Sequence, residues 1–185
     1  MKQIKNSLQT AVQKITKIHF AYVGLYMASL VAFDSWNLIA HEGVVWRWQA
    51  ASTLLVVNAV CWYLARTKLS GRMPYKLVAL ALVVADIIFA SFNVSWERGM
   101  ASKSVVLFAV PIVIAAVLHS RRAILAATTF SAAAYSFVMV RYFHLHYGEG
   151  FKVELYGTIA LYCGLFYILA MLLMAIIKPQ TTDRT

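Results

Sequence analysis

Acidic residues are scarce in this chain. Only 7 of its 185 residues are aspartate or glutamate, and charged residues of both signs make up 13%. A soluble domain carries about 25% charged and about 45–50% apolar residues. Here 62% of the residues are hydrophobic, an excess that requires an apolar solvent around the folded chain. The composition excludes an ordinary soluble domain and predicts an integral membrane protein.

Catalytic motifs are also lacking. The chain has no P-loop, no GxGxxG, no HExxH and no GxSxG elbow, so we expect that it is not an enzyme. The net charge of +10 comes from Lys and Arg at the ends of apolar runs, a pattern that predicts membrane topology rather than a nucleic-acid partner. The two cysteines, Cys61 and Cys163, lie at different depths in their runs and are not expected to form a disulfide. No feature indicates a particular cofactor.

The apolar residues fall into six runs, each close to the about 20 residues that a membrane-spanning helix needs. The runs cover residues 18–40, 46–65, 77–96, 104–119, 123–143 and 155–177. They predict an all-α membrane protein whose bundle of six transmembrane helices occupies residues 18–178. In the fourth run, Pro111 is expected to kink the helix.

The segment before the first run has a helical pattern of its own. Within residues 1–17, apolar side chains recur at helical spacing: Ile4, Leu8, Val12 and Ile15. This pattern predicts a short amphipathic helix lying on the membrane surface, with a frayed basic tail as the alternative.

The distribution of basic residues predicts the orientation. Of the 17 Lys and Arg residues, twelve lie on the side of the N-terminus and five on the opposite side of the six runs. Cytoplasmic segments of membrane proteins carry an excess of Lys and Arg, so we expect both termini to lie in the cytoplasm. The membrane is then expected to be the inner or plasma membrane of the cell. Residues 179–185 would then form a cytoplasmic tail.

Polar side chains inside the runs are the candidates for function, because ionisable groups in a membrane are costly. Asp34 lies about 26 Å along its helix from Lys17, and Asp86 about 15 Å from Lys76. Polar residues spaced three, four or seven apart share helix faces that become more polar toward the outside. They predict an outward-opening cavity that binds a ligand. Its expected lining is Asp34, Asn37, His41, Asn93, Glu97, Arg98, Arg141 and His144.

The deeper polar residues form a second set, Asp86, Asn58 and Tyr167. Asp34 has the depth to pair with Arg141, and Asp86 is closer in depth to Asn58 and Tyr167. Three interpretations stay open for these groups: hydrogen bonds that hold helices together, a ligand site and an ion pathway.

Histidines near the outer boundary raise the question of a metal. His41, His144 and His146, together with Glu149, are candidates for a zinc or copper site. The alternatives are a pH-sensitive switch and histidines that simply meet lipid headgroups.

Three stretches resemble the membrane-embedded N-terminal regions of bacterial sensor histidine kinases. They are FDSWNLI at 33–39, ERGMASKSVVLFAVPIVIAA at 97–116 and YGEGFKVELYG at 147–157. The resemblance implies a six-helix input module that passes a signal to a cytoplasmic kinase. The chain ends at Thr185 without a phosphoacceptor or ATP-binding domain, so it would be a stand-alone relative or part of a longer protein.

These observations favour a membrane sensor or receptor module. It would bind a small ligand, ion or proton in the outward-facing cavity and signal to a cytoplasmic partner. A substrate-binding component of a small-molecule transporter is the first alternative, and a channel formed by a homo-oligomer is the second. An enzyme acting on lipid or quinone is a more distant reading.

Overall fold

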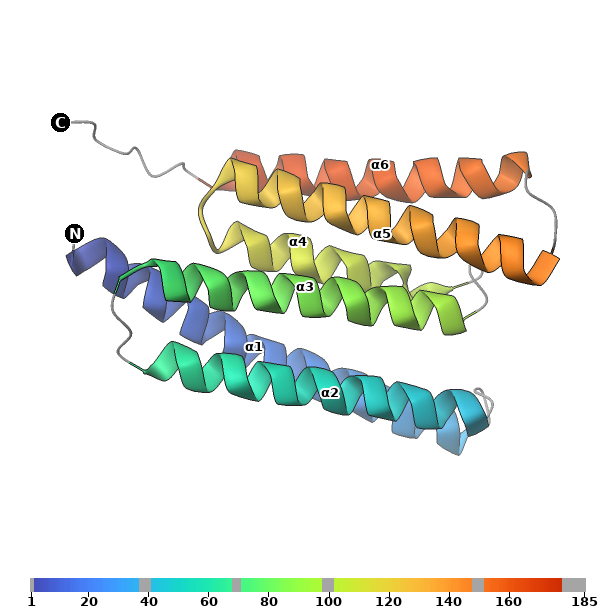
Figure 1. The fold of residues 1–185 in the computed structure, drawn as a ribbon, viewed down its shortest axis with the longest axis horizontal. Helices are drawn as coiled ribbons and strands as arrows, with labels where there is room; N and C mark the ends of the chain where they lie inside the picture. The colour runs from blue at the N-terminus through green and yellow to red at the C-terminus, as the bar shows by residue number, and fades with distance from the viewer. Residues whose placement is uncertain (1, 37–40, 68–70, 98–101, 148–151, 178–185) are drawn as a thin grey trace. The chain divides into compact units, whose positions relative to one another are not determined.

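The computed structural model describes residues 2–36, 41–67, 71–97, 102–147 and 152–177, and the regular secondary structure within these ranges is helical (Figure 1). In chain order the elements are α1 (Lys2–Ser35), α2 (His41–Arg66), α3 (Met73–Trp96), the 3-10 helix η2 (Lys103–Phe108), α4 (Ala109–Ala116), α5 (Arg121–Tyr147) and α6 (Val153–Ile176). The helices α1, α2, α3, α5 and α6 are long and apolar enough to cross a membrane. The prediction of an all-α protein is confirmed for the described residues, and the five long helices indicate a multi-pass membrane protein.

The N-terminal segment differs from the prediction. Residues 1–17 were expected to form a separate helix, but α1 is continuous from Lys2 to Ser35. No glycine or proline occurs before Gly24, so the backbone contains nothing that would interrupt the helix near Lys17. The polar face that was expected to lie toward headgroups also contacts another helix, because Gln9 and Gln13 donate hydrogen bonds to the end of α2.

The fourth apolar run is short and has two parts. Residues 103–108 form η2 and residues 109–116 form α4. Pro111, expected to kink a helix interior, lies in the first turn of α4, where the missing N–H costs little. A 3-10 helix rises about 2.0 Å per residue against about 1.5 Å for an α-helix, so the two parts together extend about 24 Å. The change of helix type therefore lengthens a segment that is short for a span.

The chain divides into two compact units, residues 1–85 (unit 1) and residues 86–185 (unit 2). Unit 1 contains α1, α2 and the first half of α3. Unit 2 contains the second half of α3, followed by η2, α4, α5 and α6.

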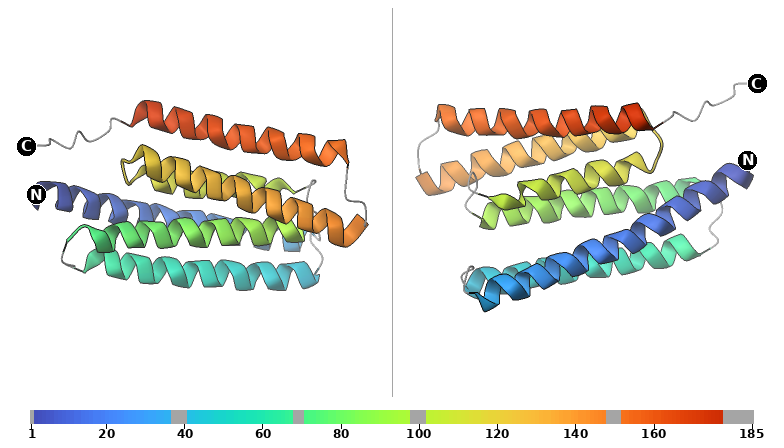
Figure 2. Two further views of the ribbon diagram at one scale, coloured as in Figure 1. Left: turned by 45° about the horizontal axis from the view of Figure 1, so that its top comes forward. Right: turned by 180° about the vertical axis from the view of Figure 1, so that it is seen from behind.

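In unit 1, α1 and α2 lie side by side along their lengths (Figure 2). The buried positions of α2 recur at alternating spacings of three and four, from Val44 through Arg47, Ala51, Leu54, Asn58 and Cys61 to Ala65. Val12, Thr16, His19 and Val23 follow the same spacing on α1. This is the heptad pattern of helices that pack at a shallow angle, with seam residues of one helix fitting between those of the other.

Side-chain amides fasten these two helices to each other. The Nε2 groups of Gln9 and Gln13 donate to the carbonyl oxygen of Ala65 at 3.2 and 2.9 Å. Asn58 Nδ2 donates to the carbonyl oxygen of Thr16 at 3.2 Å. Ala65 lies in the last turn of α2, where backbone carbonyls have no partner within the helix. The two glutamines therefore cap the end of α2 from α1.

In unit 2, an aromatic cluster fills the space among η2, α5 and α6. Tyr135 is fully buried, and its ring packs on Phe108, Tyr162 and Phe166 with centroids 5.8, 5.7 and 6.0 Å away. The surrounding hydrophobic core includes Ala90 of α3, so the second half of α3 belongs to the same packed body.

Candidate functional site

The residues predicted to line an outward-opening cavity do not share one environment. Asp34 is exposed near the end of α1 in unit 1, and Arg141 and His144 are exposed on α5 in unit 2. Asn37 and Arg98 lie outside the described residues, as does the side chain of His41. The pairing of Asp34 with Arg141 stays a prediction.

Glu97, expected to contact a ligand, bonds to the start of η2 in the structure. Its Oε2 accepts hydrogen bonds from Ser102 Oγ at 2.9 Å and from the backbone N–H of Ser104 at 3.0 Å. Ser102 is the N-cap of η2, and its Oγ also accepts from the Ser104 N–H. This carboxylate therefore holds the start of η2 next to the end of α3.

The outer histidines of α5 are exposed. The ring of His146 stacks on Tyr142 with centroids 4.1 Å apart, and its Nδ1 lies 3.0 Å from the carbonyl oxygen of Tyr142. The described part of the chain contains no group of three or more His, Cys, Asp or Glu side chains that could hold a metal ion. Glu149 and the side chain of His41, the other two metal candidates, lie outside that part.

The deep polar residues are found in three different settings. Asn58 is fully buried at the α1–α2 seam, where its amide joins the two helices. Tyr167, expected to face inward, is 38% exposed, and its hydroxyl lies 3.1 Å from Thr129 Oγ1 on the outer face of α5. Asp86 is only 1% exposed although it is a carboxylate within an apolar helix.

Asp86 shares its face of α3 with a second buried polar residue. Asn93, seven positions along, has no exposed surface, and its Nδ2 donates to the carbonyl oxygen of Phe89 at 2.8 Å. Ala90 and Val94 lie on the same side of the helix and belong to the hydrophobic core of unit 2. The predicted polar stripe of α3 therefore turns into the protein.

Another polar stripe, on α5, was missed at the sequence level. Thr128, Ser131 and Tyr135 are spaced three and four apart, and all three are fully buried. Their helical spacing, within a run that has charged residues only at its ends, could have indicated a shared polar face.

Two hydroxyls of this stripe have no hydrogen-bond partner among the described residues, Ser131 Oγ and Tyr135 Oη. Serine and threonine in a helix usually bond to the carbonyl oxygen four residues earlier. Thr128 does so to Ile124 at 2.8 Å, and Ser136 does so to Ala132 at 2.8 Å. Ser131 does not, so its hydroxyl is left to bond with something else.

The two stripes border the same hydrophobic core. Ala90 and Val94, beside Asp86 on α3, and Ile124 and Tyr135 on α5 are members of this one cluster in unit 2. The stripes thus place a carboxyl group, an amide and two hydroxyls at the border of one apolar core. This set attracts positive charge and forms hydrogen bonds, which suits a small cation or a small molecule with an amine or several hydrogen-bonding groups.

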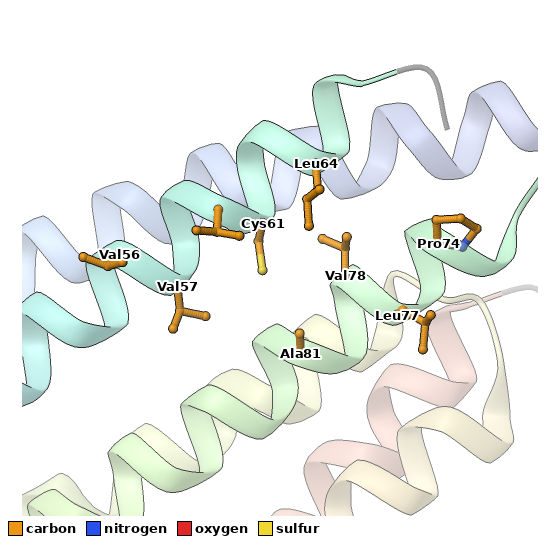
Figure 3. Close-up of a pocket in the computed structure, with 9 residues that line it drawn as sticks. Val56, Val57, Cys61, Leu64, Pro74, Leu77, Val78 and Ala81 are labelled. Carbon is orange, nitrogen blue, oxygen red and sulfur yellow. The ribbon is translucent and has the colours of Figure 1, made fainter. Parts of the chain in front are cut away.

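A groove of different character lies in unit 1, between α2 and the first half of α3 (Figure 3). It has a volume of about 540 Å³, and its lining consists of Val56, Val57, Val60, Cys61, Leu64, Pro74, Leu77, Val78 and Ala81. Its apolar lining contrasts with the polar cavity that we predicted.

Comparisons with protein-family models, curated proteins and solved structures found no match. The resemblance to sensor histidine kinases stays a prediction.

Proposed function

We propose that the chain is a six-span membrane receptor module that binds a small cationic or hydrogen-bonding ligand at the buried polar residues of unit 2. The observation that carries the proposal is a pair of buried hydroxyls without a partner among the described residues, Ser131 Oγ and Tyr135 Oη, on a stripe that borders the same core as the face of Asp86. Binding would favour one arrangement of the helices and pass the event through α6 to a cytoplasmic partner.

The topology within this proposal has both termini in the cytoplasm, as the distribution of basic residues favours. The segment formed by η2 and α4 is the fourth crossing, short but packed against α5 and α6 in unit 2. Both α3 and α5 then begin at the cytoplasmic face.

This topology brings the two polar stripes to similar depths. Asp86 lies about 20 Å along α3 from Met73, while Ser131 and Tyr135 lie about 15 and 21 Å along α5 from Arg121. Depths that agree to within a few ångströms support one site rather than two.

Hydrogen bonds that only hold helices together are the competing explanation for buried polar groups in a membrane. They account for Asn58, whose amide binds Thr16, and for the contact of Thr129 with Tyr167. They do not account for Ser131 and Tyr135, because a side chain that holds two helices together has a partner and these hydroxyls have none among the described residues. A buried hydroxyl without one costs about 1–3 kcal/mol, a cost that a ligand would offset.

The test is ligand-dependent stability of the purified full chain in mild detergent. The probes are Na⁺, K⁺, Ca²⁺, tetramethylammonium and a set of small amines, each scored by the shift in melting temperature. At least one probe should stabilise the wild type and the Thr129→Ala variant, whose substitution lies on the exposed face of α5. The same probe should have little effect on Ser131→Ala. The proposal is overturned if no probe acts, or if Ser131→Ala responds as the wild type does.

The topology has a separate test. A green fluorescent protein fused after Thr185 should fluoresce, because it folds in the cytoplasm and not after export through the general secretory route. A dark fusion at normal protein levels would contradict the proposed orientation.

A further inference from the structure

The apolar groove of unit 1 has charged residues at one end. It runs along α2 from Val56 to Leu64, a length of about 12 Å. At the Leu64 end, α2 finishes at Arg66, and α3 begins after Arg72 with Lys76 in its first turn. Lys76 and Arg66 are exposed, and Arg72 is partly exposed.

This end of unit 1 is structurally tied together. Tyr75, fully buried, donates its hydroxyl to the carbonyl oxygen of Thr67 at 3.0 Å, which joins the start of α3 to the end of α2. The guanidinium of Arg66 lies 4.7 Å from the ring centroid of Trp62. The basic residues thus lie at two helix ends that the Tyr75 hydrogen bond joins, next to the groove.

The groove lining is apolar, and several of its side chains are exposed. Val56 is 62% exposed, Val60 53% and Leu77 56%. In a membrane-spanning region, hydrocarbon chains are the solvent for such surfaces. Beyond the opposite end of the groove, near Val56 and Ala81, the helices continue uncharged to Trp48 on α2 and Ala85 on α3. Positive charge at one end and apolar lining along the rest match an amphiphile with an anionic head and a hydrocarbon tail.

We infer that this groove is a binding site for an anionic phospholipid of the surrounding bilayer. One acyl chain lies between α2 and α3, and the headgroup phosphate meets Arg72 and Lys76. Basic residues at the cytoplasmic ends of membrane helices attract anionic headgroups, each by about 1 kcal/mol, or roughly fivefold in binding. The inference uses the proposed orientation of the helices but not the proposed ligand site, because the groove lies in unit 1 and that site in unit 2.

The test is lipid binding by the full chain in detergent, measured by native mass spectrometry with dioleoyl phosphatidylglycerol and dioleoyl phosphatidylcholine. Phosphatidylglycerol should bind at least about fivefold more tightly, and added salt should reduce the difference. Ala81→Phe fills the groove and should weaken the binding of both lipids. Ala133→Phe, on the exposed face of α5, is its matched control and should change neither.

Charge variants separate the headgroup from the tail. The double variant Arg72→Gln/Lys76→Gln should lose most of the preference for phosphatidylglycerol and keep its binding of phosphatidylcholine. Arg121→Gln/Arg122→Gln, which removes the same charge from the start of α5, should retain the preference. Equal binding of the two lipids by the wild type would overturn the inference, as would equal losses in the two double variants or unchanged binding by Ala81→Phe.

Discussion

Replacing Tyr135 with phenylalanine removes one oxygen atom from the centre of unit 2 and leaves the ring in place. The ring contacts with Phe108, Tyr162 and Phe166, at centroid distances of 5.7–6.0 Å, should persist. The hydroxyl that is lost is buried and has no hydrogen-bond partner among the described residues. Its removal should therefore stabilise the ligand-free protein, in contrast to most core substitutions.

The expected gain follows from the desolvation cost of that hydroxyl. An unpaired buried polar group costs about 1–3 kcal/mol, but polar groups of an unfolded membrane protein also find partners, which reduces the difference. We expect Tyr135→Phe to raise the free energy of unfolding by about 1 kcal/mol. Tyr135→Leu should lower it, because three aromatic contacts worth about 0.5–1.5 kcal/mol each are lost.

The assay is unfolding of dialysed protein in mixed micelles titrated with sodium dodecyl sulfate. Tyr167→Phe is the matched control, because its hydroxyl has a partner in Thr129 at 3.1 Å and is partly exposed. That variant should lose about 0.5 kcal/mol. If Tyr135→Phe lowers the free energy of unfolding of ligand-free protein by more than about 1 kcal/mol, the Tyr135 hydroxyl is hydrogen-bonded within the fold. That result would contradict a ligand site at Tyr135.

Three further substitutions test the local structure by the same unfolding assay. Gln13→Ala removes the 2.9 Å donor to Ala65 and should cost about 1 kcal/mol; an unchanged midpoint would mean that the capping of α2 from α1 adds no stability. Glu97→Ala removes the oxygen that accepts from both Ser102 and Ser104 and should lower the free energy of unfolding by about 1–2 kcal/mol. Glu97→Gln should lose less, and equal losses in the two variants would exclude a charge-assisted hydrogen bond. Gly71 has a φ of 87°, so Gly71→Ala should cost about 1 kcal/mol, and a neutral result would contradict the left-handed backbone at this turn.

Five of the six apolar runs correspond to long helices, because hydropathy and length directly reflect what a bilayer requires. The sequence did not show that α1 would be continuous through Lys17. A polar face on a helix has the same pattern whether it meets headgroups or backbone carbonyls, and Gln9 and Gln13 meet the carbonyl of Ala65. The 3-10 helix at residues 103–108 was not predicted either; its N-cap, Ser102, and the N–H of Ser104 bond to Glu97, which lies five and seven residues earlier.

The candidate site was predictable only in part. Asp86 and Asn93 were expected to avoid the lipid, because a carboxylate or amide facing hydrocarbon is costly, and both are buried. Asp34 and Arg141 are exposed, a position that residues near helix ends can adopt at the membrane surface. Ser131 and Tyr135 were not predicted as site residues, because hydroxyls are common in membrane helices and usually bond to the backbone of their own helix. Only the structure distinguishes Ser131 from Thr128 in this respect.

The central claim, that the buried polar residues of unit 2 bind a small ligand, is tested most directly by native mass spectrometry of protein extracted gently from its host membrane. The wild type and the Thr129→Ala control should retain the same small added mass. Asp86→Asn and Ser131→Ala should lose that mass while remaining folded by circular dichroism. A wild type without bound mass, or the same bound mass in all four proteins, would contradict the claim.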